Sequence, residues 1–461
     1  MDASAHFRGK WITVMGLGLL GRGVGDARYL AECGAELIVT DLKTCEELAE
    51  SVAQLESFKN ITFVLGEHRL EDFNNRDLIL KAAGVPLDSI YIAEAKKNNI
   101  PVRMSADLFA EISNVTCISV TGTRGKSTVA HMIFHILKEA GKKVLLGGNV
   151  RGVSNLALLR EATPEHTAVL ELDSWQLQGW GSPSTKSDLV LGRAGMSPHI
   201  AVFATLYPDH LNYYKDRPEQ YLADKANIFL FQKPGDTLIL GRQCAPAIIE
   251  KYGDKIESKT LVVDETKLPD TWTLCIPGLH NRYNAALALT AARTIQIPDD
   301  INRHALETFK GVPGRLELIR EANGVKIYND NSSTTPEATI AALRAVGDAD
   351  NRRVILILGG DEKNLDMSGL IDEIPKWCSK VVLFKERGTN RIRDEVFALV
   401  KDGLEVYEEE GLEATVRWAL SLATPCDTIL YSPAFSSFGK YFKNEYDRGD
   451  QFVALIKKHT S

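Results

Sequence analysis

Residues 121–128 read Thr-Gly-Thr-Arg-Gly-Lys-Ser-Thr and combine the residue types that bind nucleotide phosphates. Main-chain N–H groups of a glycine-rich turn, with the positive end of the following helix, can cradle phosphate oxygens. Lys126 would neutralise the β and γ oxygens, and the hydroxyl of Ser127 or Thr128 would bind Mg²⁺. The spacing Gly-x-x-Gly-Lys-Ser is shorter than the common Gly-x-x-x-x-Gly-Lys-Ser/Thr form, so a solvated glycine turn is the alternative. Because a strand, this loop and a helix occur in the right order, we favour a nucleoside triphosphate site.

A second glycine loop, Gly-x-Gly-x-x-Gly over residues 16–21, directly follows an apolar segment, and Asp41 closes the next apolar segment. This pattern is the fingerprint of dinucleotide binding and, taken alone, would indicate NAD. A tight strand-to-helix turn without a ligand is another interpretation, and a site for a different diphosphate, such as a UDP-sugar, is a third. The triphosphate loop favours the third, with a nucleotide-linked substrate on the first part of the chain and ATP on the second.

Strands that alternate with helices must position both loops. Such alternation predicts parallel sheets with right-handed crossovers. We expect strands at residues 11–15, 37–40, 61–65, 78–80, 117–120, 168–172, 200–206, 325–328, 354–358, 381–384 and 428–431. A helix after the phosphate loop is indicated by apolar residues with a period of about 3.6, namely Val129, Met132, Ile133, Ile136 and Leu137. Further helices are expected up to Leu30, over 284–292, and from Pro336 with Thr335 as N-cap.

The composition is that of a folded globular protein. The chain has 461 residues, enough for about three domains of ~150 residues. Hydrophobic residues make up 44% and charged residues 25%, which excludes a mainly disordered chain. With 54 Lys and Arg against 61 Asp and Glu, the net charge of −7 disfavours a general nucleic-acid binder.

The cysteines and the apolar segments bear on the compartment. The 7 cysteines are scattered and include no Cys-x-x-Cys pair, which argues against a disulfide framework and a cysteine zinc site and fits a reducing compartment. No segment approaches the ~20 apolar residues of a membrane span. Residues 1–10 hold no apolar core of a signal peptide. We therefore expect a cytoplasmic, monomeric protein with no nucleic-acid or membrane partner.

With both loops in view, the chain resembles the Mur ligases along nearly its whole length. The segment 121–128 resembles the family's TGTNGKST loop, with Arg124 where Asn is usual, and Gly-Gly-Asn at 147–149 resembles its GGN motif. The segment 171–177 resembles its ELSSFQL motif, with Asp173 in place of Ser. Further similar motifs follow in order at 208–210 (Pro-Asp-His), 223–225 (Ala-Asp-Lys), 280–285 (His-Asn-x-x-Asn-Ala), 359–363 (Gly-Gly-Asp-x-Lys), 432–434 (Ser-Pro-Ala) and 442–449 (Phe-Lys-Asn-x-x-x-Arg-Gly).

The resemblance implies an α/β protein of three domains and one reaction. Residues 1–112 would form a Rossmann-like domain for the UDP-sugar, 113–312 a P-loop ATPase-type domain for ATP, and 313–461, after a hinge-like Gly-Val-Pro-Gly, a Rossmann-like domain for the amino acid. The implied enzyme adds D-glutamate to UDP-N-acetylmuramoyl-L-alanine through an acyl phosphate, in cytoplasmic peptidoglycan precursor synthesis. ATP and two Mg²⁺ ions are implied, and no NAD is expected. The cations would screen the repulsion between the substrate carboxylate and the γ-phosphate.

The resemblance also assigns residues to the site. The implied catalytic residues are Lys126, Glu171, His210 and Lys225. The implied metal ligands are Ser127, Glu171, His210 and Lys225, the last after carbamylation by CO₂. The implied ATP-binding residues are Gly122, Thr123, Arg124, Gly125, Lys126, Ser127, Thr128, Asn281, Arg315 and Asp330. The implied substrate-binding residues are Gly18, Leu19, Leu20, Asp41, Leu42, Gly84 and Asn149, and, for glutamate, Lys363, Ser437 and Phe442.

Several of these residues have a plainer interpretation when they are considered without the family. Glu171 could be a solvated strand end, and Lys225 would be read as a surface lysine on a helix. We assign Trp175, close to Glu171 in sequence, to packing.

The sequence departs from the family pattern at several positions. Arg124 adds a positive charge beside the γ-phosphate, Lys43 stands where arginine is frequent, and Ser332 stands where a lysine is common. Glu445 occupies a position where an aromatic residue often sits, just after a one-residue insertion. Because this last departure touches the glutamate pocket, the amino acid and its stereochemistry stay open, with L-glutamate or another amino acid as the alternative.

Other function classes stay open at this point. An NAD-linked oxidoreductase would use the loop at 16–21, but it has no need of Lys126 and Ser127. An ATP-driven switch would use the phosphate loop to change conformation. A folylpolyglutamate-like ligase would share the chemistry, but that family lacks a UDP-binding first domain, and the two glycine loops together argue against it.

Overall fold

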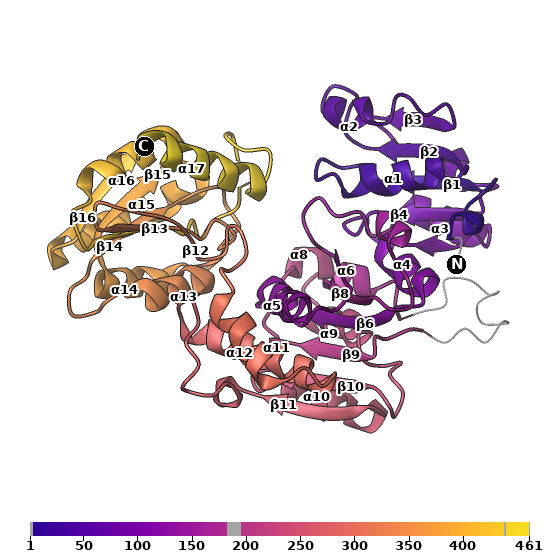
Figure 1. Cartoon of the computed structure of the whole chain (residues 1–461). Helices are drawn as coiled ribbons and strands as arrows, with labels where there is room; N and C mark the ends of the chain where they lie inside the picture. Colours follow the sequence, from indigo (N-terminus) through magenta and orange to yellow (C-terminus); the bar gives the residue numbers. More distant parts are fainter. Residues whose placement is uncertain (1–2, 182–194, 438, 461) are drawn as a thin grey trace. The chain divides into compact units, whose positions relative to one another are not determined.

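The computed structural model describes residues 3–181, 195–437 and 439–460, which form three sheets of five, six and six strands (Figure 1). The chain divides into two compact units. Residues 1–269 and 284–305 make up the first unit, and residues 270–283 and 306–461 make up the second. The first unit holds the first two sheets and the second unit holds the third. An α/β fold built on three sheets confirms the predicted fold class.

The first sheet is parallel throughout, with the strand order β3-β2-β1-β4-β5. Its strands are β1 (Trp11–Met15), β2 (Glu36–Asp41), β3 (Ile61–Leu65), β4 (Leu78–Lys81) and β5 (Val102–Arg103). The connections contain η1 (Ala3–His6), α1 (Arg22–Glu32), α2 (Ala49–Ala53), η2 (Leu70–Phe73) and α3 (Ile90–Lys97). The strand order reverses between β1 and β4, so the loops after these two strands leave the same edge in opposite directions, a place where α/β sheets bind ligands.

The second sheet is also parallel, with the order β11-β10-β9-β6-β8-β7. Its strands are β6 (Thr116–Thr121), β7 (Val144–Gly148), β8 (Thr167–Glu171), β9 (Ile200–Phe203), β10 (Thr237–Gly241) and β11 (Lys259–Val263). The helices are α4 (Ser105–Ser113), α5 (Lys126–Glu139), η3 (Ala157–Arg160), α6 (Ser174–Leu177), α8 (Leu211–Tyr214), α9 (Pro218–Ala226), α10 (Ala245–Tyr252), η4 (Gly253–Lys255), η5 (Glu265–Lys267), α11 (Leu279–Thr294) and α12 (Asp299–Thr308). The phosphate loop therefore follows a central strand, β6, where neighbouring loops can supply side chains.

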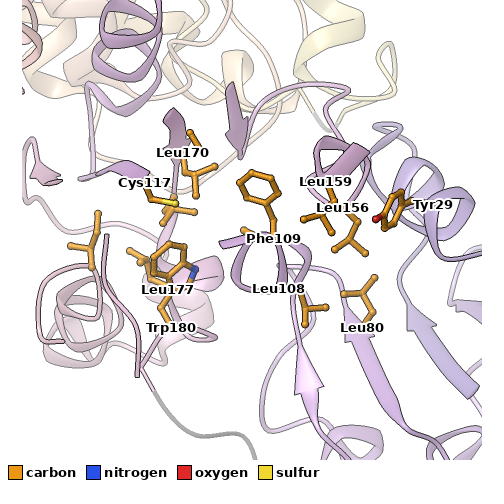
Figure 2. Close-up of a cluster of buried hydrophobic side chains, with 14 of the residues drawn as sticks. Tyr29, Leu80, Leu108, Phe109, Cys117, Leu156, Leu159, Leu170, Leu177 and Trp180 are labelled. Carbon is orange, nitrogen blue, oxygen red and sulfur yellow. The ribbon is translucent and has the colours of Figure 1, made fainter. Parts of the chain in front are cut away.

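The first two sheets share one hydrophobic core. Figure 2 shows Phe109 of α4 lying between Cys117 and Leu170 of the second sheet on one side and Leu156 and Tyr29 on the other. All these side chains are buried, and removing such apolar surface from water is the main driving force for association. The glycine loops of the two sheets are therefore carried by one packed body.

A buried carboxylate also ties α1 to the second sheet. Ser154 Oγ donates a 2.6 Å hydrogen bond to Asp26 Oδ1, and the Leu156 N–H donates one of 3.2 Å. Burial raises the pKa of Asp26 to about 6. A Cβ at Gly25 would lie 2.5 Å from the Cβ of Ser154, so the helix approaches this loop as closely as a glycine allows.

The third sheet is covered on both faces by helices. Its order is β12-β13-β17-β14-β15-β16, with only the edge strand β12 antiparallel among these pairs. The strands are β12 (Glu317–Ala322), β13 (Val325–Asn329), β14 (Val354–Leu358), β15 (Cys378–Phe384), β16 (Glu405–Glu409) and β17 (Thr428–Tyr431). The helices are α13 (Pro336–Val346), α14 (Ser368–Trp377), α15 (Arg387–Ala398), η6 (Leu399–Asp402), α16 (Leu412–Leu422) and α17 (Glu445–His459). Alternate residues of β14 join two separate clusters, one with α13 to α15 and one with α16 and α17.

Every strand expected from the sequence is present, although β9 ends at Phe203 rather than at residue 206. Strands β5, β7, β10, β11, β12 and β16 were not predicted. Thr335 lies at the N-cap position of α13, but its side chain makes no cap hydrogen bond. All seven cysteines are free, as their spacing predicts. Among the described residues, no helix has the length and apolar character needed to cross a membrane.

Candidate active site

The phosphate loop passes so close to its neighbours that two glycines are required. Gly122 has a φ of 141° and Gly125 a φ of 85°, which other residues rarely adopt. A Cβ at Gly122 would lie 2.8 Å from the main-chain nitrogen of Thr205 after β9. A Cβ at Gly125 would lie 2.6 Å from Oδ1 of Asn284 in α11. Asn284 was not predicted to be a site residue, although it belongs to the motif at 280–285.

Side chains from distant parts of the chain brace the same loop. The Thr123 hydroxyl donates to the carbonyl oxygen of Tyr207 at 3.1 Å, accepts from its N–H at 2.9 Å, and lies 3.1 Å from the Tyr221 hydroxyl. The Arg124 N–H donates to Thr205 Oγ1 at 2.8 Å. Thr123 is 3% exposed, so its side chain supports the loop from within.

Lys126 lies across its own loop at the start of α5. Its Nζ donates to the carbonyl oxygens of Gly122 at 3.0 Å and Thr123 at 3.2 Å. Ser127 is buried beside it in the first turn of α5, and Thr128 is half-buried. The ammonium, the loop N–H groups and the hydroxyls therefore gather at the amino end of one helix, the arrangement that suits a polyphosphate.

Lys225 is buried beside the phosphate loop, so the surface-lysine interpretation is wrong. Its side chain is 1% exposed, and Nζ donates to Thr121 Oγ1 at 3.2 Å and to the Gly122 carbonyl oxygen at 3.0 Å. Burial, reinforced by the Lys126 ammonium, moves the pKa of Lys225 well below its ordinary value. Compared with an exposed lysine, this shift favours the neutral amine, which is the nucleophilic form.

Glu171 and His210 approach the same edge of the sheet from two sides of β6. Glu171 ends β8 and is 4% exposed, which excludes the solvated strand end. His210 follows β9 with a φ of 53°, a strained conformation that clusters at functional sites. The Trp175 ring packs on the His210 ring with centroids 4.7 Å apart, so its packing role includes this imidazole. Burial lowers the pKa of His210, which favours the neutral ring.

Arg124, the departure in the phosphate loop, has a partner in the structure. Its Nη1 lies 3.3 Å from Oδ2 of Asp209, the residue before His210. The extra positive charge is therefore partly balanced by a carboxylate within the same site. This pairing is a physical reason for the arginine at this position.

The donor set of the implied metal site is incomplete while Lys225 is an amine. Within the described residues, no group of three or more His, Cys, Asp and Glu side chains could hold a metal ion. Glu171 and His210 are the implied ligands of these types, and Ser127 adds a hydroxyl. Mg²⁺ prefers oxygen ligands, and an ammonium repels it. The residues fit a cation site once Lys225 is carbamylated, because this modification adds a carboxylate. The reaction with CO₂ requires the neutral amine.

The first glycine loop is arranged around a carboxylate. The Gly18 N–H donates to Asp41 Oδ2 at 3.0 Å, and the Lys43 N–H donates to Asp41 Oδ1 at 3.0 Å. Leu19 is 40% exposed and Leu42 is 66% exposed, while Leu20 is half-buried. Gly84, in the loop after β4, is exposed. The predicted substrate residues thus lie in the loops that follow β1, β2 and β4 at one edge of the sheet.

Asn149 connects this loop with the second sheet. Its side-chain oxygen accepts a hydrogen bond from the guanidinium of Arg22, the first residue of α1. Its main-chain N–H donates to the Glu171 carbonyl oxygen at 2.6 Å. Gly148 precedes it with a φ of 85°, and a Cβ there would lie 2.0 Å from that same carbonyl oxygen. One residue therefore contacts both the end of the glycine loop and the strand that carries Glu171.

In the second unit, Lys363 lies beside a residue that the sequence analysis did not select. Lys363 Nζ donates to Thr334 Oγ1 at 2.9 Å, which places a hydroxyl next to the lysine expected to receive glutamate. Ser437 is buried. Phe442 packs in the core with its ring 5.7 Å from that of Phe384, so a contact with glutamate would have to come from its main chain.

Asp330 of the same unit is held by three protein donors. It accepts hydrogen bonds from the Leu316 N–H at 2.9 Å, from Ser432 Oγ at 2.8 Å and from Ser333 Oγ. Burial raises the pKa of Asp330 to about 6. Arg315 is exposed. The ATP contacts of Asp330 and Arg315 stay predictions.

Asn281 and Glu445 also have local structural explanations. Asn281 Nδ2 donates to the Pro277 carbonyl oxygen at 2.7 Å, and its contact with ATP stays a prediction. Glu445 is the first residue of α17, where a carboxylate interacts favourably with the helix dipole. Asn444 caps the same helix by accepting from two N–H groups. The acidic residue at 445 is thus suited to its place at a helix start.

Three family descriptions match consecutive parts of the chain. Residues 10–104 match "Mur ligase MurD-like, N-terminal domain", residues 120–267 match "Mur ligase middle domain", and residues 314–435 match "Mur ligase, glutamate ligase domain". Together they cover more than half of the sequence and reach into all three sheets.

Curated relatives and solved structures agree with these matches. The chain is 34% identical to the UDP-N-acetylmuramoylalanine--D-glutamate ligase of Roseiflexus sp. (strain RS-1), covering 98% of this chain and 99% of the relative. It is 32% identical to the enzyme of the same name from Borreliella burgdorferi (strain ZS7), covering 96% of each. In fold it is similar to UDP-N-acetylmuramate-alanine ligase MurC from Thermotoga maritima, with a TM-score of 0.62, 16% identity, and coverage of 98% of this chain and 100% of the other. It is also similar to the ADP complex of MurF ligase from Thermotoga maritima, with a TM-score of 0.55, 17% identity, and coverage of 99% and 96%.

Proposed function

The chain belongs to the Mur ligase family, and we propose that it joins D-glutamate to UDP-N-acetylmuramoyl-L-alanine with conversion of ATP to ADP and phosphate. It is an ATP-dependent ligase of peptidoglycan synthesis, as are the curated relatives that match it over nearly its full length. The observation that carries the proposal is the convergence of Lys126, Lys225, Glu171 and His210 at one edge of the second sheet. That edge lies in the same packed unit as the first glycine loop.

We assign one substrate to each part of the chain. Residues 1–112 bind the UDP-linked substrate through Gly18, Leu19, Leu20, Asp41, Leu42 and Gly84. Residues 113–312 bind ATP through the phosphate loop and Asn281, while Asn149 contacts the UDP-linked substrate. Residues 313–461 bind glutamate through Lys363, Ser437 and Phe442, and contact ATP through Arg315 and Asp330. A solved MurF relative with a similar fold is described in complex with ADP, which supports nucleotide binding by this architecture.

The reaction requires two anions to meet. The substrate carboxylate attacks the γ-phosphorus, the bond to the β-γ bridging oxygen breaks, and ADP leaves. The glutamate amine then attacks the acyl carbon, loses a proton, and phosphate leaves as the amide forms. Lys126 offsets the charge of the transferring phosphoryl group, a contribution worth several kcal/mol in low-dielectric sites. Exclusion of water protects the acyl phosphate from hydrolysis.

Divalent cations would supply the remaining charge screening. Ser127 and Glu171 would hold one Mg²⁺ ion, and Glu171, His210 and carbamylated Lys225 would hold a second ion. When bound, the metal lowers the electrostatic barrier between carboxylate and phosphate. The burial of Lys225 and its lowered pKa support this assignment, because the neutral amine reacts with CO₂, releases a proton and leaves an anionic carboxylate.

The proposal also covers the compartment, the oligomeric state and the cofactor. We propose that the enzyme works in the cytoplasm as a monomer, on small-molecule substrates, without NAD. The hydrogen bond from the Gly18 N–H to Asp41 is compatible with a UDP-linked ligand because the diphosphate needs only the remaining N–H groups of the loop.

An amino-acid panel tests the proposal. The full chain is mixed with UDP-N-acetylmuramoyl-L-alanine, ATP, Mg²⁺ and bicarbonate, and each amino acid is supplied in turn. We expect D-glutamate to give a new amide by mass spectrometry, with phosphate released in equal amount. A product with L-glutamate alone would favour the alternative substrate, and no product with any amino acid would overturn the ligase assignment. NAD added in excess should leave binding of the UDP-linked substrate unchanged.

A further inference from the structure

A buried lysine stands behind the loop that follows β4. Lys81 is the last residue of that strand, and its side chain is 3% exposed. Its Nζ donates to the carbonyl oxygens of Ala82 and Ala83, both at 3.3 Å, and of Val85 at 3.0 Å. One ammonium therefore gathers three carbonyl oxygens of a single loop toward the interior.

The same loop holds two main-chain N–H groups without an acceptor in the described part of the chain, and they belong to Ala83 and Gly84. Gly84 is exposed, and a Cβ built there would meet no atom within 4 Å. Successive main-chain N–H groups that face the same open side form a concave site for anions. Lys81 thus engages the carbonyl oxygens of the loop, while the N–H groups of Ala83 and Gly84 stay available to a ligand.

The loop also lies against the first glycine loop. A Cβ at Gly16 would be only 2.7 Å from the Cβ of Ala82, so the two loops are in direct contact. They follow β1 and β4, the strands between which the order of the first sheet reverses. An anion held between these loops would occupy the position that parallel α/β sheets offer to their ligands.

We propose that Lys81 is a positioning residue for the UDP-linked substrate: its ammonium holds the 82–86 loop in the shape that directs the N–H groups of Ala83 and Gly84 to the diphosphate. This inference rests on the proposed function. Lys81 acts through the loop and does not touch the substrate, because the carbonyl oxygens enclose its ammonium.

The charges around Lys81 keep its ammonium protonated at neutral pH. Burial lowers the pKa of Lys81 to about 8, against the attraction of Asp173, Asp107 and Asp224 and with the repulsion of Lys96. Asp107 is itself paired with Arg103. Above about pH 8 the ammonium becomes an amine, which holds the carbonyl oxygens less strongly. Affinity for the substrate should therefore fall as the pH rises through this value.

Calorimetric titration of the full chain with UDP-N-acetylmuramoyl-L-alanine, without ATP, tests the inference. We expect the Kd of the wild type to rise about tenfold from about pH 7 to about pH 9. Lys81→Met should bind about tenfold more weakly at neutral pH and show no such dependence. Lys81→Arg, whose charge persists over this range, should bind at neutral pH like the wild type and lose the pH dependence.

Asp173→Ser sharpens the test. Asp173 caps α6 by accepting from the Gln176 N–H at 2.8 Å, and serine is an equally good cap, so the fold is preserved while one charge is removed. The midpoint of the binding profile should move to lower pH because Lys81 loses an attractive carboxylate. Melting temperatures of all variants control for unfolding.

The outcomes separate this inference from the proposed function. If the wild type binds no UDP-linked substrate at neutral pH, the proposed function fails. If the wild type binds but its Kd is constant over this pH range, or if folded Lys81→Met binds as tightly as the wild type, the role of Lys81 is overturned and the proposed function stands.

Discussion

Two buried lysines stand behind the two ligand loops of the first unit, and their surroundings differ. Lys81 donates to three carbonyl oxygens and is attracted by nearby carboxylates, so it keeps its proton at neutral pH. Lys225 donates to one hydroxyl and one carbonyl oxygen, and its burial, together with repulsion from the Lys126 ammonium, moves its pKa well below the ordinary value. Burial lowers the pKa of both lysines, and the balance with the neighbouring charges differs between them. This balance leaves Lys81 a cation at neutral pH and makes Lys225 the candidate for covalent modification.

The largest expected effect is a loss of turnover, without a loss of substrate affinity, when the lysine of the phosphate loop is removed. Lys126→Ala should lower turnover by roughly 10³-fold because one cation that screens the γ-phosphate is lost. The Kd for UDP-N-acetylmuramoyl-L-alanine should change by less than about twofold, since we propose that this substrate binds to the other loop. Steady-state kinetics and calorimetry measure the two quantities. Lys142→Ala, an exposed lysine of the same domain, is the matched control. A comparable loss in substrate affinity would contradict the separation.

Arginine substitutions compare the two buried lysines directly. Lys225→Arg carries a permanent charge and cannot take up CO₂, and we expect activity to fall by about 100-fold. Lys81→Arg should retain most of the activity at neutral pH because its role is to be a cation. Lys233→Arg, at an exposed position, controls for the substitution itself. Full activity of Lys225→Arg would show that the Lys225 amine is not modified, and it would contradict the different roles assigned to the two lysines.

The glycines of the two loops provide a smaller, steric contrast. Gly125 and Gly18 both have positive φ angles, 85° and 66°, so alanine costs about 1–2 kcal/mol of backbone strain at either position. At Gly125 the new Cβ would also lie 2.6 Å from Asn284, whereas at Gly18 it would meet nothing within 4 Å. We expect Gly125→Ala to lower the melting temperature and ATP affinity more than Gly18→Ala lowers stability and substrate affinity. Equal effects of the two substitutions would mean that the phosphate loop can move away from α11 without a loss of stability or ATP affinity.

The smallest expected effect concerns the carboxylate that joins α1 to the second sheet. The pKa of Asp26 is about 6 in the folded chain against an ordinary value of 3.8, so the folded state binds its proton more tightly than the unfolded state does. The contribution of Asp26 to stability therefore decreases as the pH rises from about 4 to about 6, by at most about 3 kcal/mol. Asp26→Asn should remove this part of the pH dependence in urea unfolding.

Asp254→Asn, at an exposed position of η4, is the control for the substitution itself. An unchanged pH profile of stability in Asp26→Asn would contradict the role of the buried Asp26 carboxylate. Asp330, buried in the second unit with its pKa also raised to about 6, should leave a residual slope of the same sign.

Much of the fold follows from local sequence. Strand β14 consists of five consecutive apolar residues and is buried on both sides, so its pattern is unambiguous. Strand β16, Glu-Val-Tyr-Glu-Glu, lies at a sheet edge and is half-exposed. Its charged residues therefore give no apolar pattern from which a strand could be predicted. Strand β12 is an antiparallel edge strand whose sequence, Glu-Leu-Ile-Arg-Glu-Ala, resembles a helix. Tertiary pairing, not local preference, decides such segments.

Some residues of the candidate site can likewise be predicted from local sequence, and others cannot. The glycine loops, Lys126 and Asp41 are readable because strand, loop and helix are consecutive in the chain. The supports Thr123–Tyr221 and Gly125–Asn284 join residues far apart in sequence, and only the folded chain brings them together. The burial of Lys225 and the cluster of carbonyl oxygens around Lys81 have no local signature either. The sequence identifies groups that touch ligands more readily than the groups that hold them.

The central claim is that the carboxylate of the UDP-linked substrate attacks ATP held by the phosphate loop. An isotope-transfer experiment tests it most directly: the carboxylate of UDP-N-acetylmuramoyl-L-alanine is labelled with heavy oxygen, the full reaction with D-glutamate is run, and the released phosphate is analysed by mass spectrometry. Attack through an acyl phosphate transfers one labelled oxygen to each phosphate formed. Amide product accompanied by unlabelled phosphate would contradict the account.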